Sequence, residues 1–132
     1  MTDYEIMRDI CLSFSAFASG AGVPIALPGA TFTPPDSGHW LELNIAPNNF
    51  DDTLADQYAY KRGVITLSVV FRKGSSQYEY GKAYQLVADI ATGYPKESVL
   101  SGSAVVSSIP RPLSMFEYED RIMIPVSIEY SE

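Results

Sequence analysis

One stretch of alternating residues constrains the fold of this chain more than any other feature. Residues 58–71 form one long alternating stretch, in which Ile65, Leu67, Val69 and Phe71 recur at every second position, the period of a β-strand. At about 3.3 Å per residue, these residues would extend over roughly 45 Å. A compact domain of this length has a diameter of only about 36 Å. The sequence therefore predicts one long strand or hairpin that protrudes, and an unpaired strand edge favours assembly with a partner.

Two apolar stripes at helical spacing predict two helices, each beginning at a capping box. The first follows Thr2 and ends at Gly20 and Gly22, and the second follows Ser76 and ends at Gly93. The predicted stripes contain Ile6, Met7, Ile10, Cys11, Phe14 and Phe17 in the first helix, and Tyr80, Ala83, Tyr84, Val87 and Ile90 in the second.

Alternating apolar residues predict three more strands, at 40–45, 104–109 and 122–130. In the long strand, the set that begins at Ile65 is the more apolar and is expected to face the core. Pro125 predicts that the last strand is an edge strand or contains a bulge. The expected fold is α+β: an antiparallel or mixed sheet of about four to five strands, with two helices packed on one face.

Length and composition limit the functional classes. A hydrophobic content of 46% fits a single domain over residues 1–132 with one core. The sequence has no apolar run that would cross a bilayer and no basic-then-apolar leader, so we expect a soluble protein made in the cytoplasm. Sixteen acidic and nine basic residues give a net charge of −7, which disfavours nucleic-acid binding.

Residues with chemical potential are few and scattered. His39 is the single histidine and lies in a turn, and the single cysteine, Cys11, fits a small core position. We therefore expect no metal, cofactor or catalytic residue. The segment 74–83 superficially resembles a phosphate-binding loop, but six residues separate its glycines, and Ala83 replaces the serine or threonine. Carboxylates at 51–52 and 117–120 fall in predicted turns and are interpreted as solvated charges.

A polar loop at 48–57 precedes the long strand and carries three aspartates. Near the start of the strand, Lys61 and Arg62 carry the opposite charge. They would pair with those aspartates on another copy of the chain. Two tyrosines beside them have amphipathic rings that suit an interface as well as a core. The predicted subunit-contact residues are Asp51, Asp52, Asp56, Tyr58, Tyr60, Lys61 and Arg62.

Short segments along nearly the whole chain, taken in order, resemble the successive elements of a family of small phage proteins. They are residues 24–28, 31–34, 40–41, 62–69, 81–90, 109–110 and 125–128. On these segments the chain resembles the tail terminator, or tail completion, proteins of long-tailed phages.

This resemblance implies a structural protein of the virion, without enzymatic activity. It implies a homo-oligomeric ring of six copies at the head-proximal end of the tail tube. Such a ring stops polymerisation of the tail tube protein, offers a surface to a neck or head completion protein, and lets DNA pass through its lumen. In this setting, Arg62 and Lys61 would face the aspartates of the adjacent subunit.

Two alternatives stay open at this point. The first is another ring-forming neck component, such as a head completion or connector protein. The second belongs to a different class, a small-ligand-binding or enzymatic α+β domain that uses His39 and the carboxylate clusters.

Overall fold

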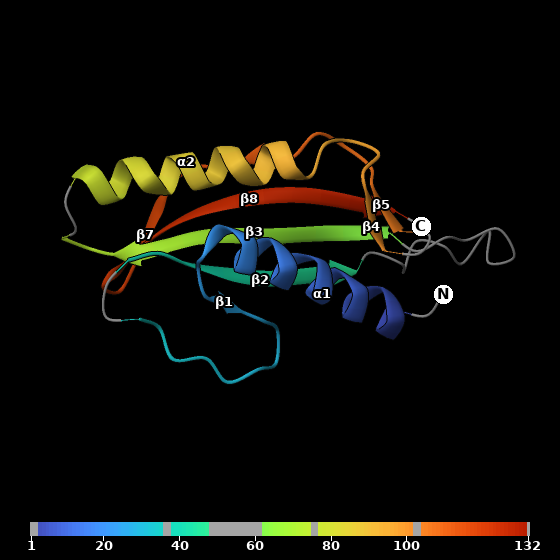
Figure 1. Cartoon of the computed structure of the whole chain (residues 1–132), viewed down its shortest axis with the longest axis horizontal. Helices are drawn as coiled ribbons and strands as arrows, with labels where there is room; N and C mark the ends of the chain where they lie inside the picture. Colours follow the sequence, from blue (N-terminus) through green and yellow to red (C-terminus); the bar gives the residue numbers. More distant parts are fainter. Residues whose placement is uncertain (1–2, 36–37, 48–61, 75–76, 102–103, 132) are drawn as a thin grey trace, which may run out of the picture.

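The computed structural model describes residues 3–35, 38–47, 62–74, 77–101 and 104–131. These residues form two helices and eight strands (Figure 1). In chain order they are α1 (Asp3–Ala21), β1 (Ile25–Ala26), β2 (Trp40–Pro47), β3 (Arg62–Arg72), α2 (Gln77–Gly93), β4 (Val99–Ser101), β5 (Ala104–Val106), β6 (Arg111–Pro112), β7 (Phe116–Tyr118) and β8 (Arg121–Ser131).

The described strands form one sheet with β3 and β8 at its centre (Figure 1). The strand order is β1-β2-β3-β8-β5-β4, and β6 and β7 also pair with β8. β1 runs parallel to β2, whereas the other strand pairs are antiparallel, so the sheet is mixed. The predicted α+β class is confirmed, with more strands than expected. β1, β4, β6 and β7 are two or three residues long, too short to produce an alternating pattern in the sequence.

Both helices end where the sequence signals place them. After α1, Gly22 adopts a left-handed φ of 74°, and the Val23 amide donates to the Ala18 carbonyl at 3.0 Å. This six-residue closure is the Schellman arrangement, which satisfies carbonyls that the helix end leaves unpaired. α2 ends at Gly93, two residues before Pro95.

The two helices cover one face of the sheet, as predicted. Their buried stripes join the inward side chains of β2, β3 and β8 in a single hydrophobic cluster. On β3 the inward set is the predicted one, Ile65, Leu67, Val69 and Phe71, each at most 2% exposed. The helical members are Ile6, Ile10, Phe14 and Ala18 from α1, and Ala83, Leu86, Val87 and Ile90 from α2.

The stripe of α2 is rotated from the predicted one at its first turns. Tyr80 and Tyr84 were expected in the core but are 39% and 43% exposed, whereas Leu86 is buried. The Tyr80 ring still contacts the edge of the Phe71 ring, at 6.1 Å between centroids. Tyrosine thus lies at the border of the interface, where the ring packs and the hydroxyl group reaches water.

The expected unpaired backbone of the long strand is absent from its described part. β3 pairs with β8 from Arg62 to Arg72 and with β2 from Gly63 to Val70. The first residues of the predicted strand, 58–61, lie outside the described residues. Over 62–72, therefore, the strand is central and does not protrude.

The prediction that β8 is an edge strand or contains a bulge is wrong, because β8 pairs along both of its sides and its register with β3 runs from Arg121 to Ser131 without a shift. Pro125 is tolerated for a local reason. Its carbonyl accepts a hydrogen bond from the Leu113 amide at 2.8 Å, so its missing amide hydrogen points to that same outer side. There β6 has already ended at Pro112, and β7 does not begin until Phe116.

Candidate assembly surface

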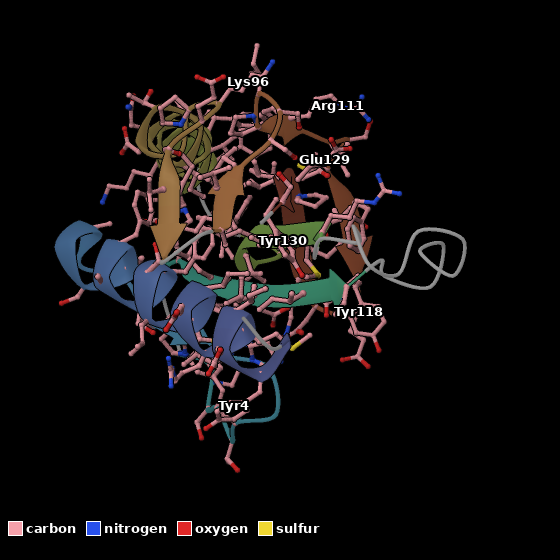
Figure 2. The ribbon with its side chains drawn as sticks, turned by 90° about the vertical axis from the view of Figure 1, so that its right-hand side faces the viewer. Tyr4, Lys96, Arg111, Tyr118, Glu129 and Tyr130 are labelled. Carbon is pink, nitrogen blue, oxygen red and sulfur yellow. The ribbon has the colours of Figure 1, made fainter. Side chains whose placement is uncertain are left out.

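Most of the predicted contact residues cannot be placed. Asp51, Asp52, Asp56, Tyr58, Tyr60 and Lys61 lie outside the described residues. Arg62 is described: it is exposed at the start of β3. It borders a hollow of about 310 Å³ that is also lined by Ser107, Glu129 and Tyr130 (Figure 2 labels the last two). The predicted pairing of Arg62 with these aspartates on another copy stays a prediction, because the aspartates lie outside the described residues.

The sheet face opposite the helices is only partly covered by the described residues. Its right-hand half in Figure 1 carries small and polar side chains that are exposed or half-buried, apart from buried Ser68. Two further hollows open on this half, one beside Asn44 and Thr66 and one beside Ser127. We call this half the open face, defined by Glu42, Asn44, Ala46, Val64, Thr66, Ser68, Ser127 and Glu129.

The other half of this face is closed by two arginines above Trp40. The guanidinium carbons of Arg72 and Arg121 lie 5.7 and 5.5 Å from the centroid of the indole ring, and Trp40 is fully buried. Arg72 also donates to the Pro35 carbonyl at 3.3 Å, which holds the proline-rich connector at this end. Arg121 forms an ion pair with Glu42 at 3.5 Å. The boundary of the open face is thus fixed by cation–π and ionic contacts.

A second exposed surface follows the outer side of β8. From residue 111 to residue 120 every side chain is exposed, although this segment contains many apolar residues. A run of exposed large apolar side chains is uncommon on a monomeric protein and indicates a contact surface. We call it the apolar edge; its members are Ile109, Leu113, Met115, Phe116 and Tyr118.

The end of the apolar edge is attached to the central strands. β7 and β8 form a hairpin whose tip contains Glu119, a non-glycine residue with a φ of 56°. Next to the tip, Arg72 pairs with Asp120 and Lys73 pairs with Glu117, both at 2.9 Å. These pairs hold the hairpin in place while its apolar side chains face outward.

A third surface lies on the opposite edge of the sheet. The first turns of α1 and the end of β2 enclose an apolar hollow of about 290 Å³. Tyr4, at its mouth, is 74% exposed and points away from the sheet in Figure 2. We call this hollow the α1 groove; it is lined by Tyr4, Met7, Arg8, Cys11, Pro28 and Ile45.

His39 packs between the sheet and the start of α2. One ring nitrogen, Nε2, lies 2.7 Å from the Glu79 carbonyl oxygen, and Nδ1 lies 3.4 Å from the Glu79 carboxylate. The carbonyl oxygen accepts, so Nε2 donates its proton. The side chain is 8% exposed and its ring lies 5.5 Å from the Phe71 ring. His39 was expected in a solvated turn; instead it links β2 to the first turn of α2.

The remaining chemical candidates do not converge. Among the described residues, no group of three histidine, cysteine, aspartate or glutamate side chains is placed to hold a metal ion. Gly81 and Lys82 lie inside α2, so the segment that superficially resembled a phosphate loop is helix at these positions. Burial raises the pKa of the Cys11 thiol. Neither α1 nor α2 has the length and apolarity needed to cross a bilayer.

The apolar edge is the feature that the sequence reading missed. The sequence predicts a strand that ends at Ile109, and the carboxylates at 117–120 are interpreted as solvated turn charges. The available signal was its apolar density: Leu113, Met115, Phe116 and Tyr118 fall within six residues that show no helical or strand period. Apolar residues that do not recur at helical or strand spacing do not form one face of a helix or strand that could be buried. Such residues are expected to be exposed.

Comparison with known proteins decides the family. A family model described as "Phage tail terminator protein" matches residues 6–130, nearly the whole chain. The chain belongs to the phage tail terminator family. It is accordingly a structural protein of the phage tail and is associated with the virion.

A solved structure of a protein without a descriptive name has the same fold. Its TM-score to this chain is 0.77 at 21% sequence identity, and the match covers 99% of this chain and 95% of that chain. At this identity the similarity supports the fold alone. A search of curated proteins finds no match.

Proposed function

We propose that this terminator caps the head-proximal end of the tail tube as a ring of six copies. The ring ends polymerisation of the tube protein and presents a surface to a neck or head completion protein. Membership of the terminator family is the observation that carries this proposal. The size of the ring is taken from the family resemblance.

The distribution of exposed surfaces supports an assembling protein. The open face, the apolar edge and the α1 groove lie on three sides of one sheet. A subunit in a ring needs two different contact surfaces for its neighbours, and a capping subunit needs a further one for the tube. The net charge of −7 suits a lumen through which DNA passes without binding.

The proposed function is tested by disabling the gene in the parent phage and examining lysates by electron microscopy. Loss of a terminator should give headless tails of uncontrolled and excessive length. Tails of normal length beside tailless heads would point to a head-joining protein instead, and normal virions would exclude both roles.

The predicted ionic contact belongs to this ring. We propose that Lys61 and Arg62 face Asp51, Asp52 or Asp56 of the adjacent copy. Arg62→Glu should weaken assembly, and reversal of the partner aspartate should partly restore it, because the two charges would again be opposite. Ring formation that is unaffected by Arg62→Glu would show that this contact map is wrong.

A further inference from the structure

The single histidine of the chain, His39, lies on the side of the sheet that the helices cover. It comes directly before β2, and its ring packs against Phe71, a member of the inward set of β3. The side chain is 8% exposed, so the ring has little room to turn away from its neighbours. Both of its nitrogens face oxygen atoms of one residue in the first turn of α2, Glu79.

The two oxygen atoms that the ring faces are both acceptors. Nε2 lies 2.7 Å from the Glu79 carbonyl oxygen, and Nδ1 lies 3.4 Å from the Glu79 carboxylate. A carbonyl oxygen and an ionised carboxylate accept hydrogen bonds and donate none. A neutral imidazole has one N–H, so its second nitrogen would turn a lone pair toward the carboxylate. An imidazolium has two N–H groups and satisfies both oxygen atoms.

The electrostatics of the contact favour the imidazolium. A buried charge is costly unless a partner of opposite sign lies close to it. The Glu79 side chain keeps 28% of its surface exposed, so water still hydrates part of the carboxylate and lowers the cost of the pair. At 3.4 Å the carboxylate attracts an imidazolium but repels a nitrogen lone pair. Imidazole is ordinarily a stronger base than a carboxylate, so the extra proton lies on the ring.

The charged groups nearby do not oppose this pairing. On β3, the guanidinium of Arg72 lies over the indole ring of Trp40, which faces the other side of the sheet. On α2, Tyr80 packs its ring against β3, and Lys82 is exposed one turn after Glu79. Among the residues that the structure describes, Glu79 supplies the ion-pair contact of the histidine.

We propose that His39 is an imidazolium in the folded protein at pH 7 and forms, with Glu79, a pH-sensitive latch between the sheet and α2. Because the fold favours the protonated ring, the latch stabilises the structure at mildly acidic pH. This contribution is lost as the pH rises and the ring gives up its second proton. Histidine ordinarily changes its charge between about pH 5 and pH 8, so the latch responds near neutral pH. It lies within one copy, and its test does not depend on the proposed ring.

The single histidine makes the protonation state directly measurable. Nitrogen-15 NMR of the intact chain gives one set of imidazole signals, because no second histidine is present. The chemical shifts of the two ring nitrogens distinguish an imidazolium from a neutral ring that carries one hydrogen. At pH 7 the proposal predicts that both nitrogens of His39 are predominantly protonated. A ring with a hydrogen on Nε2 alone at this pH would overturn the proposal.

Glu79→Gln tests the role of the carboxylate. A glutamine amide can donate as well as accept, so it satisfies the lone pair of a neutral ring. In this variant His39 should be predominantly neutral at pH 7. Between pH 6 and pH 8, the unfolding equilibrium constant of the unmodified chain should rise about tenfold more than that of the variant, because the variant has no charged hydrogen bond to lose.

The matched control is Glu117→Gln, which removes an exposed carboxylate that pairs with Lys73 and has no printed contact with the ring. This variant should keep the pH dependence of the unmodified chain, measured by urea unfolding at each pH. An equal pH dependence for Glu79→Gln and the unmodified chain would overturn the latch, as would the same loss of pH dependence in both variants.

Discussion

The two faces of β3 illustrate two different uses of one strand. The face that begins at Ile65 is covered by both helices and is almost fully buried. The face that begins at Val64 carries smaller or polar side chains, and neither α1 nor α2 covers its Val64–Ser68 half. Burial of apolar area stabilises the fold by about 25 cal/mol per Å². The covered face therefore stabilises the fold, and we expect the open face to be the one that is free for assembly.

Neighbouring residues on β3 provide the sharpest test of this division. Ile65→Ala should lower the free energy of unfolding by about 2–5 kcal/mol, because it leaves a cavity in the core. Thr66→Ala, one residue further on the open face, should change it by less than about 1 kcal/mol. Urea unfolding monitored by circular dichroism measures both values. Similar losses for the two variants would contradict the division.

Two glycines extend the comparison to backbone packing. A Cβ atom on Gly63 would lie 2.6 Å from the Ala46 carbonyl oxygen and 2.7 Å from the Tyr130 hydroxyl. Gly63→Ala should therefore destabilise the fold by about 1–3 kcal/mol through overpacking.

The control for Gly63 lies inside α2. Gly81 has no heavy atom within 4 Å of the position that a Cβ would take. Gly81→Ala should stabilise the fold by about 0.5–1 kcal/mol, since alanine is the better helix former. Thermal unfolding of the two variants should thus shift in opposite directions, and a shared direction would show that close packing at Gly63 does not matter.

Tyr94 tests the covered face through pH. Its ring stacks on Phe14 at 4.4 Å, and its hydroxyl donates to the Ser13 carbonyl at 3.2 Å. Burial raises the pKa of Tyr94 above its ordinary value of 10.0, since the fold favours the neutral phenol. This stabilisation is complete below the unfolded-state pKa and is lost as pH rises through the folded-state pKa.

Tyr94→Phe should remove part of that alkaline loss. At neutral pH the variant should lose about 0.5–1.5 kcal/mol, the net contribution of one hydrogen bond. Unfolding free energies measured at pH 7 and above pH 10 check both expectations. An alkaline loss as steep as that of the unmodified chain would exclude Tyr94 as its source.

The smallest effect is expected where the β7–β8 hairpin meets the end of β3. Asp120→Asn breaks an exposed ion pair with Arg72, so the free energy of unfolding should fall by less than about 1 kcal/mol. The difference from the unmodified chain should shrink further in high salt, because salt screens exposed charges. A loss as large as that of Ile65→Ala would mean that the hairpin belongs to the core.

Long periodic elements of this fold were predictable, and short ones were not. α1, α2, β2, β3 and the inward face of β3 follow from apolar spacing and end signals. β6 and β7 are too short to show a period, and they form because β8 offers an unpaired side. The expectation from Pro125 was wrong because a proline removes the hydrogen-bond donor of one residue only. It does not determine where the strand lies in the sheet.

For the candidate site, local residue signals were insufficient. The opposite charges and the tyrosines predicted subunit contacts within residues 51–62. Of the residues named there, Arg62 alone belongs to the described part of the chain. The α1 groove joins residues that lie far apart in sequence, from Tyr4 to Ile45. The apolar edge is defined by the exposure of its side chains. Exposure is set by tertiary packing, which one sequence does not display.

The most direct test combines the open face with the terminator role in one measurement. The gene-disabled phage is supplied with either the unmodified chain or Thr66→Arg, and tail lengths are measured by electron microscopy. Thr66→Arg places a bulky charge on the open face, and its urea unfolding midpoint should match that of the unmodified chain. Our account predicts uniform tails with the unmodified chain and overlong, headless tails with Thr66→Arg. Uniform tails and normal virions with a folded Thr66→Arg chain would contradict it.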